Sequence, residues 1–145
     1  MGFDMLFITA ADVKLRKRKP TSHKGENGRV LVVAGSIDYV GAAYLAGMTA
    51  FRSGVDAVVV AAPEKVAWAI NCLSPDFITK KFKGEFFTTA AIKEIAEMSK
   101  KFDAVVLSGG SKYEVSDSPE AFEEQFKIIK SGKPVFGVCL GFQAV

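Results

Sequence analysis

Short, nearly uninterrupted runs of apolar and β-branched residues alternate along this sequence with segments of helix length. Four such runs cover residues 29–34, 55–61, 103–108 and 133–139, and a weaker one covers residues 77–81. They do not alternate between polar and apolar side chains, which predicts strands buried on both faces and hence a parallel sheet. The intervening segments, residues 41–52, 64–73, 89–100 and 119–130, predict helices. The pattern indicates a single three-layer α/β domain with a mostly parallel five-stranded sheet, Rossmann-like or flavodoxin-like.

The composition limits the classes of protein to which this chain can belong. The chain has 145 residues, 49% of them hydrophobic, which is ample for the core of one domain. Its apolar runs are broken well short of the roughly 20 residues that a membrane helix needs. Asp4 stands where a secretory signal would carry basic residues, so we expect a cytoplasmic protein with no membrane partner. Two cysteines without C-x-x-C spacing and one histidine give no metal-ligand set.

Positive charge is concentrated before the first predicted strand. The basic residues there are Lys14, Arg16, Lys17, Arg18, Lys19 and Lys24, with no acid between them. Such a run could bind phosphates of nucleic acid, but it lacks interleaved aromatic residues for base stacking. We therefore expect residues 1–28 to form a solvated basic arm without a nucleic-acid partner, and residues 29–145 to form the α/β domain.

In a sheet of this kind, ligands usually bind in the crevice at the carboxyl ends of the strands. The loop after the first predicted strand places glycines at 35 and 41, and it opens a helix rich in small residues. A helix N-terminus can bind an anion through its free N–H groups. The spacing matches neither a dinucleotide G-x-G-x-x-G nor a G-x-x-x-x-G-K-[ST] loop, so taken alone the segment is also compatible with a plain tight turn.

Residues 22–36, followed by residues 39–42 and 44–46, match the sequence pattern of one enzyme family in the same order along the chain. Over about residues 16–107 the sequence resembles the ADP/ATP-dependent NAD(P)H-hydrate dehydratases, which are ribokinase-like lyases. The resemblance implies that residues 41–44 line the pocket for a hydrated nicotinamide nucleotide. It makes Gly41, Ala42 and Tyr44 the candidate substrate contacts, and ATP, ADP or an NAD(P)H derivative the candidate ligands. No cofactor follows from composition or spacing alone.

The chemistry of that family depends on further motifs, among them a Gly-Pro-Gly strand end and an Asp-Ala-Asp-Ala strand end. A Gly-x-Gly-Asp turn supplies the catalytic aspartate and the anion hole for nucleotide phosphates. None of the three occurs in these 145 residues. We therefore expect no ATP- or ADP-dependent dehydration by this chain.

Residues 103–110 and 133–143 resemble a different family, the class I glutamine amidotransferases. Its G-x-C-x-G-x-Q pattern is filled by Gly137, Cys139, Gly141 and Gln143. By this resemblance Cys139 is the nucleophile, and backbone N–H groups near Gly110 and Leu140 form the oxyanion hole. Cysteine catalysis also needs a base held by a third group. The only histidine is His23, which has no glutamate at the family's His-x-Glu spacing, so we expect no glutamine hydrolysis.

The two resemblances meet at residues 103–110, which favours a recombined or engineered domain that is catalytically incomplete. One alternative is a remnant of an NAD(P)H-hydrate dehydratase, a lyase, that still binds nucleotide. Another is a glutaminase-like half-site that uses Cys139, and a third is a scaffold without chemistry. Uncovered apolar surface makes a homodimer or a domain swap a possible partner arrangement.

Of the two thiols, we expect Cys139 to be the more reactive. Cys72 lies four residues after Trp68 in a helical apolar stretch, which predicts that it faces the sheet and is buried.

Overall fold

In the computed structural model, residues 9–15, 17–109 and 123–138 are described. Over these residues strands and helices alternate, as the sequence predicts. The elements are β1 (Arg29–Val33), α1 (Val40–Arg52), β2 (Ala57–Pro63), α2 (Glu64–Leu73), β3 (Ile78–Phe82), α3 (Thr89–Ser99), β4 (Ala104–Leu107), α4 (Glu123–Ile129) and β5 (Val135–Gly137).

The strands form one sheet in the order β3-β2-β1-β4-β5, and every neighbouring pair is parallel. The predicted parallel five-stranded sheet is therefore confirmed. β1 is its centre, where Leu31 lies in register with Val59 of β2 and Val105 of β4. The second strand begins later than the sequence predicts. Gly54 has a φ of 95° and the Asp56 N–H donates to the Gly28 carbonyl, so the chain is still turning there.

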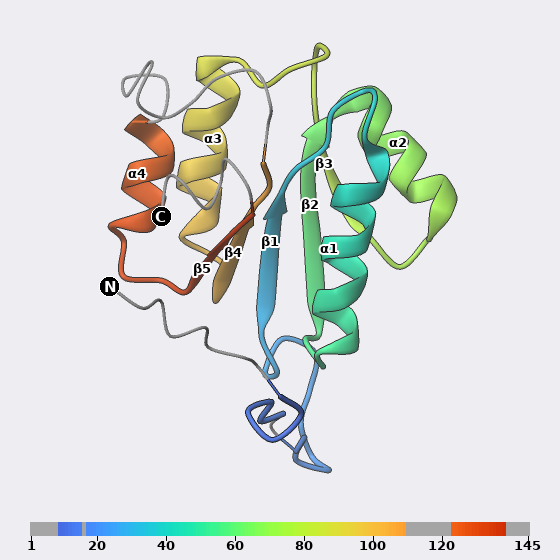
Figure 1. The fold of residues 1–145 in the computed structure, drawn as a ribbon, viewed down its shortest axis with the longest axis vertical. Helices are drawn as coiled ribbons and strands as arrows, with labels where there is room; N and C mark the ends of the chain where they lie inside the picture. The colour runs from blue at the N-terminus through green and yellow to red at the C-terminus, as the bar shows by residue number, and fades with distance from the viewer. Residues whose placement is uncertain (1–8, 16, 110–122, 139–145) are drawn as a thin grey trace, which may run out of the picture.

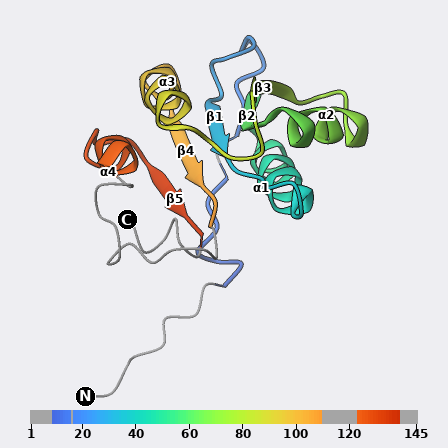
Figure 2. The same ribbon diagram turned by 90° about the horizontal axis from the view of Figure 1, so that it is seen from above.

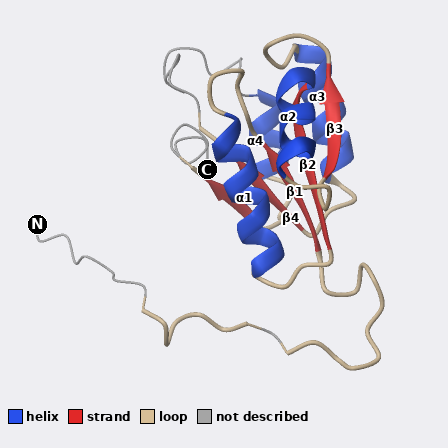
Figure 3. Ribbon diagram, turned by 90° about the vertical axis from the view of Figure 1, so that its right-hand side faces the viewer, coloured by secondary structure: helices blue, strands red, loops and turns tan. Residues whose placement is uncertain are grey.

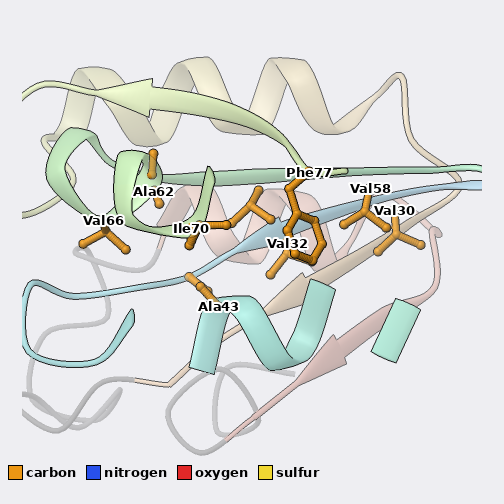
Figure 4. Close-up of a cluster of buried hydrophobic side chains, with 11 residues drawn as sticks. Val30, Val32, Ala43, Val58, Ala62, Val66, Ile70 and Phe77 are labelled. Atoms are coloured by element: carbon orange, nitrogen blue, oxygen red, sulfur yellow. The ribbon is translucent and has the colours of Figure 1, made fainter. Parts of the chain in front are cut away.

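Helices cover both faces of the sheet: α1 and α2 lie on one side and α3 and α4 on the other (Figures 1 and 2). Two apolar clusters result. The first core, between the sheet and α1 and α2, includes Val32, Val66 and Ile70 (Figure 4). The second core, on the α3 and α4 side, includes Leu31 and Ile95. Because side chains of a strand point alternately to its two faces, β1 supplies both cores.

The sequence-based placement of Cys72 is wrong. The buried residues of α2 are Val66, Ala67 and Ile70, whereas Cys72 is exposed. Cys72 does share a helix face with Trp68, as the four-residue spacing predicts, but that face points away from the sheet: Trp68 is 57% exposed.

The described part of the basic arm lies beyond the amino ends of the strands (Figures 1 and 3) and is mostly exposed. It is anchored at one point. An Arg18 Nη2 lies 2.7 Å from Asp56 Oδ1 and donates to the Gly54 carbonyl at 2.8 Å. Asp56, whose side chain is 6% exposed, also accepts hydrogen bonds from the backbone N–H groups of Gly25 and Asn27.

Candidate functional site

The strand order fixes where a crevice can form. From β1 the chain continues to β2 and β3 on one side, whereas β4 and β5 lie on the other. The order therefore reverses between β1 and β4, and at such a reversal the loops after the two strands diverge and leave a crevice at the carboxyl ends. Residues 34–39 and 108–109 occupy this position, and the Ser108 N–H donates to the Val33 carbonyl at 3.0 Å.

The loop after β1 requires a glycine. Gly35 has a φ of +99°, and a Cβ atom there would lie 2.7 Å from Val66 Cγ1 of α2. A side chain is thus excluded by both backbone conformation and space. The Tyr39 N–H then donates to the Ser36 carbonyl at 3.0 Å, which completes the turn into α1.

The first turn of α1 carries the three residues predicted to bind substrate. Gly41 and Ala42 are exposed, and a Cβ atom on Gly41 would meet nothing within 4 Å. Tyr44 is only partly exposed, because its ring packs edge-on against Phe77 at a centroid distance of 5.7 Å. The structure therefore leaves Gly41 and Ala42 exposed at the start of α1, whereas the Tyr44 ring packs against the first core.

The start of α1 lacks the side-chain cap that an N-cap residue can provide. The N-cap residue Tyr39 makes no side-chain capping bond, and the first turn contains no acidic residue. By contrast, Thr88 at the start of α3 accepts a hydrogen bond from the Ala91 N–H. The free N–H groups and the positive end of the helix dipole make the start of α1 favourable for negative charge.

The residues predicted from the amidotransferase resemblance, Cys139, Gly110 and Leu140, lie outside the described residues. His23, the only histidine of the sequence, precedes the amino end of β1. Val138 follows the carboxyl end of β5, so it lies at the opposite end of the parallel strands from His23. A histidine base is therefore absent from the described carboxyl edge.

The model of one protein family, described as NAD(P)H-hydrate dehydratase, matches residues 30–127. The chain belongs to the NAD(P)H-hydrate dehydratase family. The match spans residues 103–110, so neither a junction there nor the amidotransferase resemblance gains support from it.

Curated relatives agree with the assignment to the dehydratase family. A bifunctional NAD(P)H-hydrate repair enzyme of Methanothermobacter thermautotrophicus is 42% identical over 77% of this chain, which corresponds to 22% of that enzyme. An ADP-dependent (S)-NAD(P)H-hydrate dehydratase of Nitrosopumilus maritimus is 36% identical over 71% of this chain and 37% of that protein. The chain thus spans well under half of the length of these dehydratase relatives.

Solved structures show the same relationship. The ADP/ATP-dependent NAD(P)H-hydrate dehydratase of Bacillus subtilis, co-crystallised with ATP and Mg²⁺, matches with a TM-score of 0.64 and 26% identity. That match covers 86% of this chain and 42% of the Bacillus chain. A hypothetical protein of Streptococcus mutans matches with a TM-score of 0.63 at 23% identity. That match covers 83% of this chain and 41% of the Streptococcus chain, and it supports the fold.

A hollow of about 440 Å³ lies at the amino ends of the strands. Its lining includes Lys14, Arg18 and Asp103. Arg18 is paired with Asp56, and Asp103 accepts a hydrogen bond from the Arg29 N–H at 2.8 Å. These polar groups hold the arm and the strand starts together, so we assign the hollow a structural role.

No group of three or more His, Cys, Asp or Glu side chains within residues 9–15, 17–109 and 123–138 is arranged to hold a metal ion. Among the same residues, no helix is long and apolar enough to cross a membrane.

Proposed function

We propose that this chain forms the nucleotide-binding part of an NAD(P)H-hydrate dehydratase site, in the crevice between the carboxyl ends of β1 and β4. The ligand class is a nicotinamide dinucleotide, in its hydrated or intact form. Support comes from the family assignment and from relatives whose names specify NAD(P)H-hydrate repair or dehydration.

One observation carries this proposal: the open first turn of α1. Gly41 has no neighbouring atom within 4 Å of the place where a side chain would begin. A dinucleotide bears negative phosphates, which the uncapped N–H groups at the start of a helix can bind. A glycine at this point lets a ligand approach the backbone closely.

Binding and turnover are separate parts of the proposal. These 145 residues do not include the Gly-x-Gly-Asp turn that is expected to supply the catalytic aspartate of this family. The chain by itself should therefore bind dinucleotide without dehydrating it, in the presence or absence of ATP or ADP.

The decisive experiment fills the open space with a side chain. Calorimetric titration with NADPH and with hydrated NADPH should give at least tenfold weaker binding for Gly41→Leu than for the unaltered chain. The matched control is Thr49→Leu, an exposed position two turns further along the same helix. It adds a similar side chain far from the crevice and should leave binding unchanged.

Two results would contradict the proposal. Equal affinity of Gly41→Leu and Thr49→Leu would place the ligand elsewhere. Steady dehydration of hydrated NADPH by the purified chain, lost in Gly41→Leu, would show that the site is complete.

A further inference from the structure

The strand order β3-β2-β1-β4-β5 provides room for both halves of a dinucleotide. β1 has β2 on one side and β4 on the other, and the order reverses between β1 and β4. In doubly wound sheets with this strand order, each half of the sheet takes one nucleotide of the dinucleotide. One nucleotide then lies over the carboxyl end of β2, where α2 begins without an intervening loop.

Glu64 is the acidic residue at that point. It follows Pro63, the last residue of β2, and it is the first residue of α2. Glu64 is exposed, and in the described part of the chain no ion pair involves its carboxylate. In dinucleotide-binding sheets, an acidic side chain about 20 residues beyond the glycine loop accepts a hydrogen bond from the adenosine ribose. Glu64 follows Gly41 by a similar interval.

The loop after β1 packs against the start of α2. A Cβ atom built on Gly35 would lie 2.7 Å from Val66 Cγ1, 3.6 Å from Ala43 Cβ and 3.7 Å from Ala62 Cβ. These three neighbours belong to α2, α1 and β2, and Figure 4 shows them together in the first core. Glu64 stands between Ala62 and Val66 in the chain. The starts of α1 and α2 therefore meet at the same loop, and Glu64 lies within one helical turn of it.

A carboxylate at this place can distinguish two dinucleotides. The adenosine ribose of NADH has free 2′ and 3′ hydroxyls, which can donate to the two oxygens of a carboxylate. In NADPH the 2′ oxygen carries a phosphate, which is negative and has lost that donor. A phosphate beside a carboxylate is unfavourable because like charges repel. The family description, NAD(P)H-hydrate dehydratase, covers both forms and leaves this preference open.

We propose that Glu64 is a specificity-determining residue of this chain. Its carboxylate accepts the two ribose hydroxyls of the adenosine half, and it selects NADH-type over NADPH-type dinucleotides. The inference rests on the proposed function, since it takes the dinucleotide to bind at the start of α1. It does not depend on the glycine spacing of the loop after β1, which differs from the usual dinucleotide motif.

The test is calorimetric titration with NADH and with NADPH, which differ only in the 2′-phosphate. The unaltered chain should bind NADH at least about tenfold more tightly than NADPH, and Glu64→Gln should bring the two affinities within about threefold of each other. The matched control is Glu97→Gln, which removes an equal charge from an exposed position near the end of α3. It should keep the preference of the unaltered chain.

The ratio of the two affinities also separates this role from a structural one. Glu64 lies in the first turn of α2, where a negative charge favours the helix dipole. Loss of that effect alone would lower the melting temperature of Glu64→Gln and would change the binding of both dinucleotides equally. Lys65, the next residue, is exposed and could instead attract the 2′-phosphate. Lys65→Gln should leave the preference for NADH in place.

Two outcomes would overturn the role of Glu64 while leaving the proposed function intact. One is the same ratio of affinities in Glu64→Gln and Glu97→Gln. The other is a preference of the unaltered chain for NADPH that Lys65→Gln removes. In either case Gly41→Leu would still weaken dinucleotide binding. Failure of the unaltered chain to bind either dinucleotide would overturn both proposals together.

Discussion

Asp56 connects the arm to the sheet through a small set of charged and polar contacts. Hydrogen bonds from the Asn27 backbone N–H lower the pKa of this carboxyl from its ordinary value of 3.8, and burial opposes them. The Asn27 side chain, the Gly25 N–H and the Arg18 guanidinium add to the lowering of the pKa. A carboxyl with a lowered folded pKa stabilises the fold fully above its unfolded value and loses that contribution as pH falls through the folded value.

Asp56→Asn should therefore change how stability depends on pH. Above the ordinary carboxyl pKa of 3.8 the variant should be less stable than the unaltered chain. On acidification below that value the difference should shrink, because only the unaltered chain has a carboxylate to protonate. Urea unfolding on both sides of this pH measures it, with the exposed Asp76→Asn as control. A difference that stays constant with pH would contradict the assignment.

Within α1, two glycines have opposite roles although both lie in a helix. Gly41 faces open space, whereas a Cβ atom on Gly47 would lie 2.7 Å from the Phe77 ring. Glycine in a helix costs roughly 0.5–1 kcal/mol relative to alanine, so Gly41→Ala should stabilise the fold by up to about that amount. Gly47→Ala should destabilise it by about 1–3 kcal/mol, since it overpacks the first core. Urea titration of the two variants decides this, and effects of the same sign would refute it.

At this scale the sequence predicts the existence of each element better than its orientation. The strands are recognisable because their residues are apolar on both faces. The exposed face of α2 is not recognisable from the sequence, because apolar residues lie on all sides of that helix. Ile70 points inward, whereas Trp68 points outward. A helix without a polar face does not indicate which side meets the sheet. The anchor of Arg18 at Asp56 depends on residues far apart in the chain, which local patterns do not relate.

Across the whole molecule, β1 couples the two cores, because Val32 packs into the first and Leu31 into the second. Unfolding should therefore be a single cooperative transition. Ile70→Ala on one side and Ile95→Ala on the other should each cost about 2–5 kcal/mol. The single tryptophan, Trp68, reports on the α2 side. Its fluorescence should follow urea unfolding of Ile95→Ala at the same midpoint as circular dichroism. Separate midpoints would show that the cores are independent.

The fold class follows from the sequence because burial of parallel strands leaves a clear composition. The strand order does not, since it depends on which apolar strand pairs with β1 on each edge, and several strands are similarly apolar. Gly41 and Ala42 could thus be named from a family resemblance, but their exposure at the start of α1 required the structure. The same resemblance could not show that the Tyr44 ring packs on Phe77.

The unequal span of the two cores bears on how the chain folds during synthesis. The buried residues of the first core all lie between Val30 and Phe77, whereas those of the second extend from Leu31 to Ile128. A ribosome adds about 5–20 residues per second, so the first core is available for seconds before β4 emerges. During that interval one edge of β1 has no partner and its Leu31 face has no cover. Nascent chains of this length should therefore depend on chaperones more than the finished domain does.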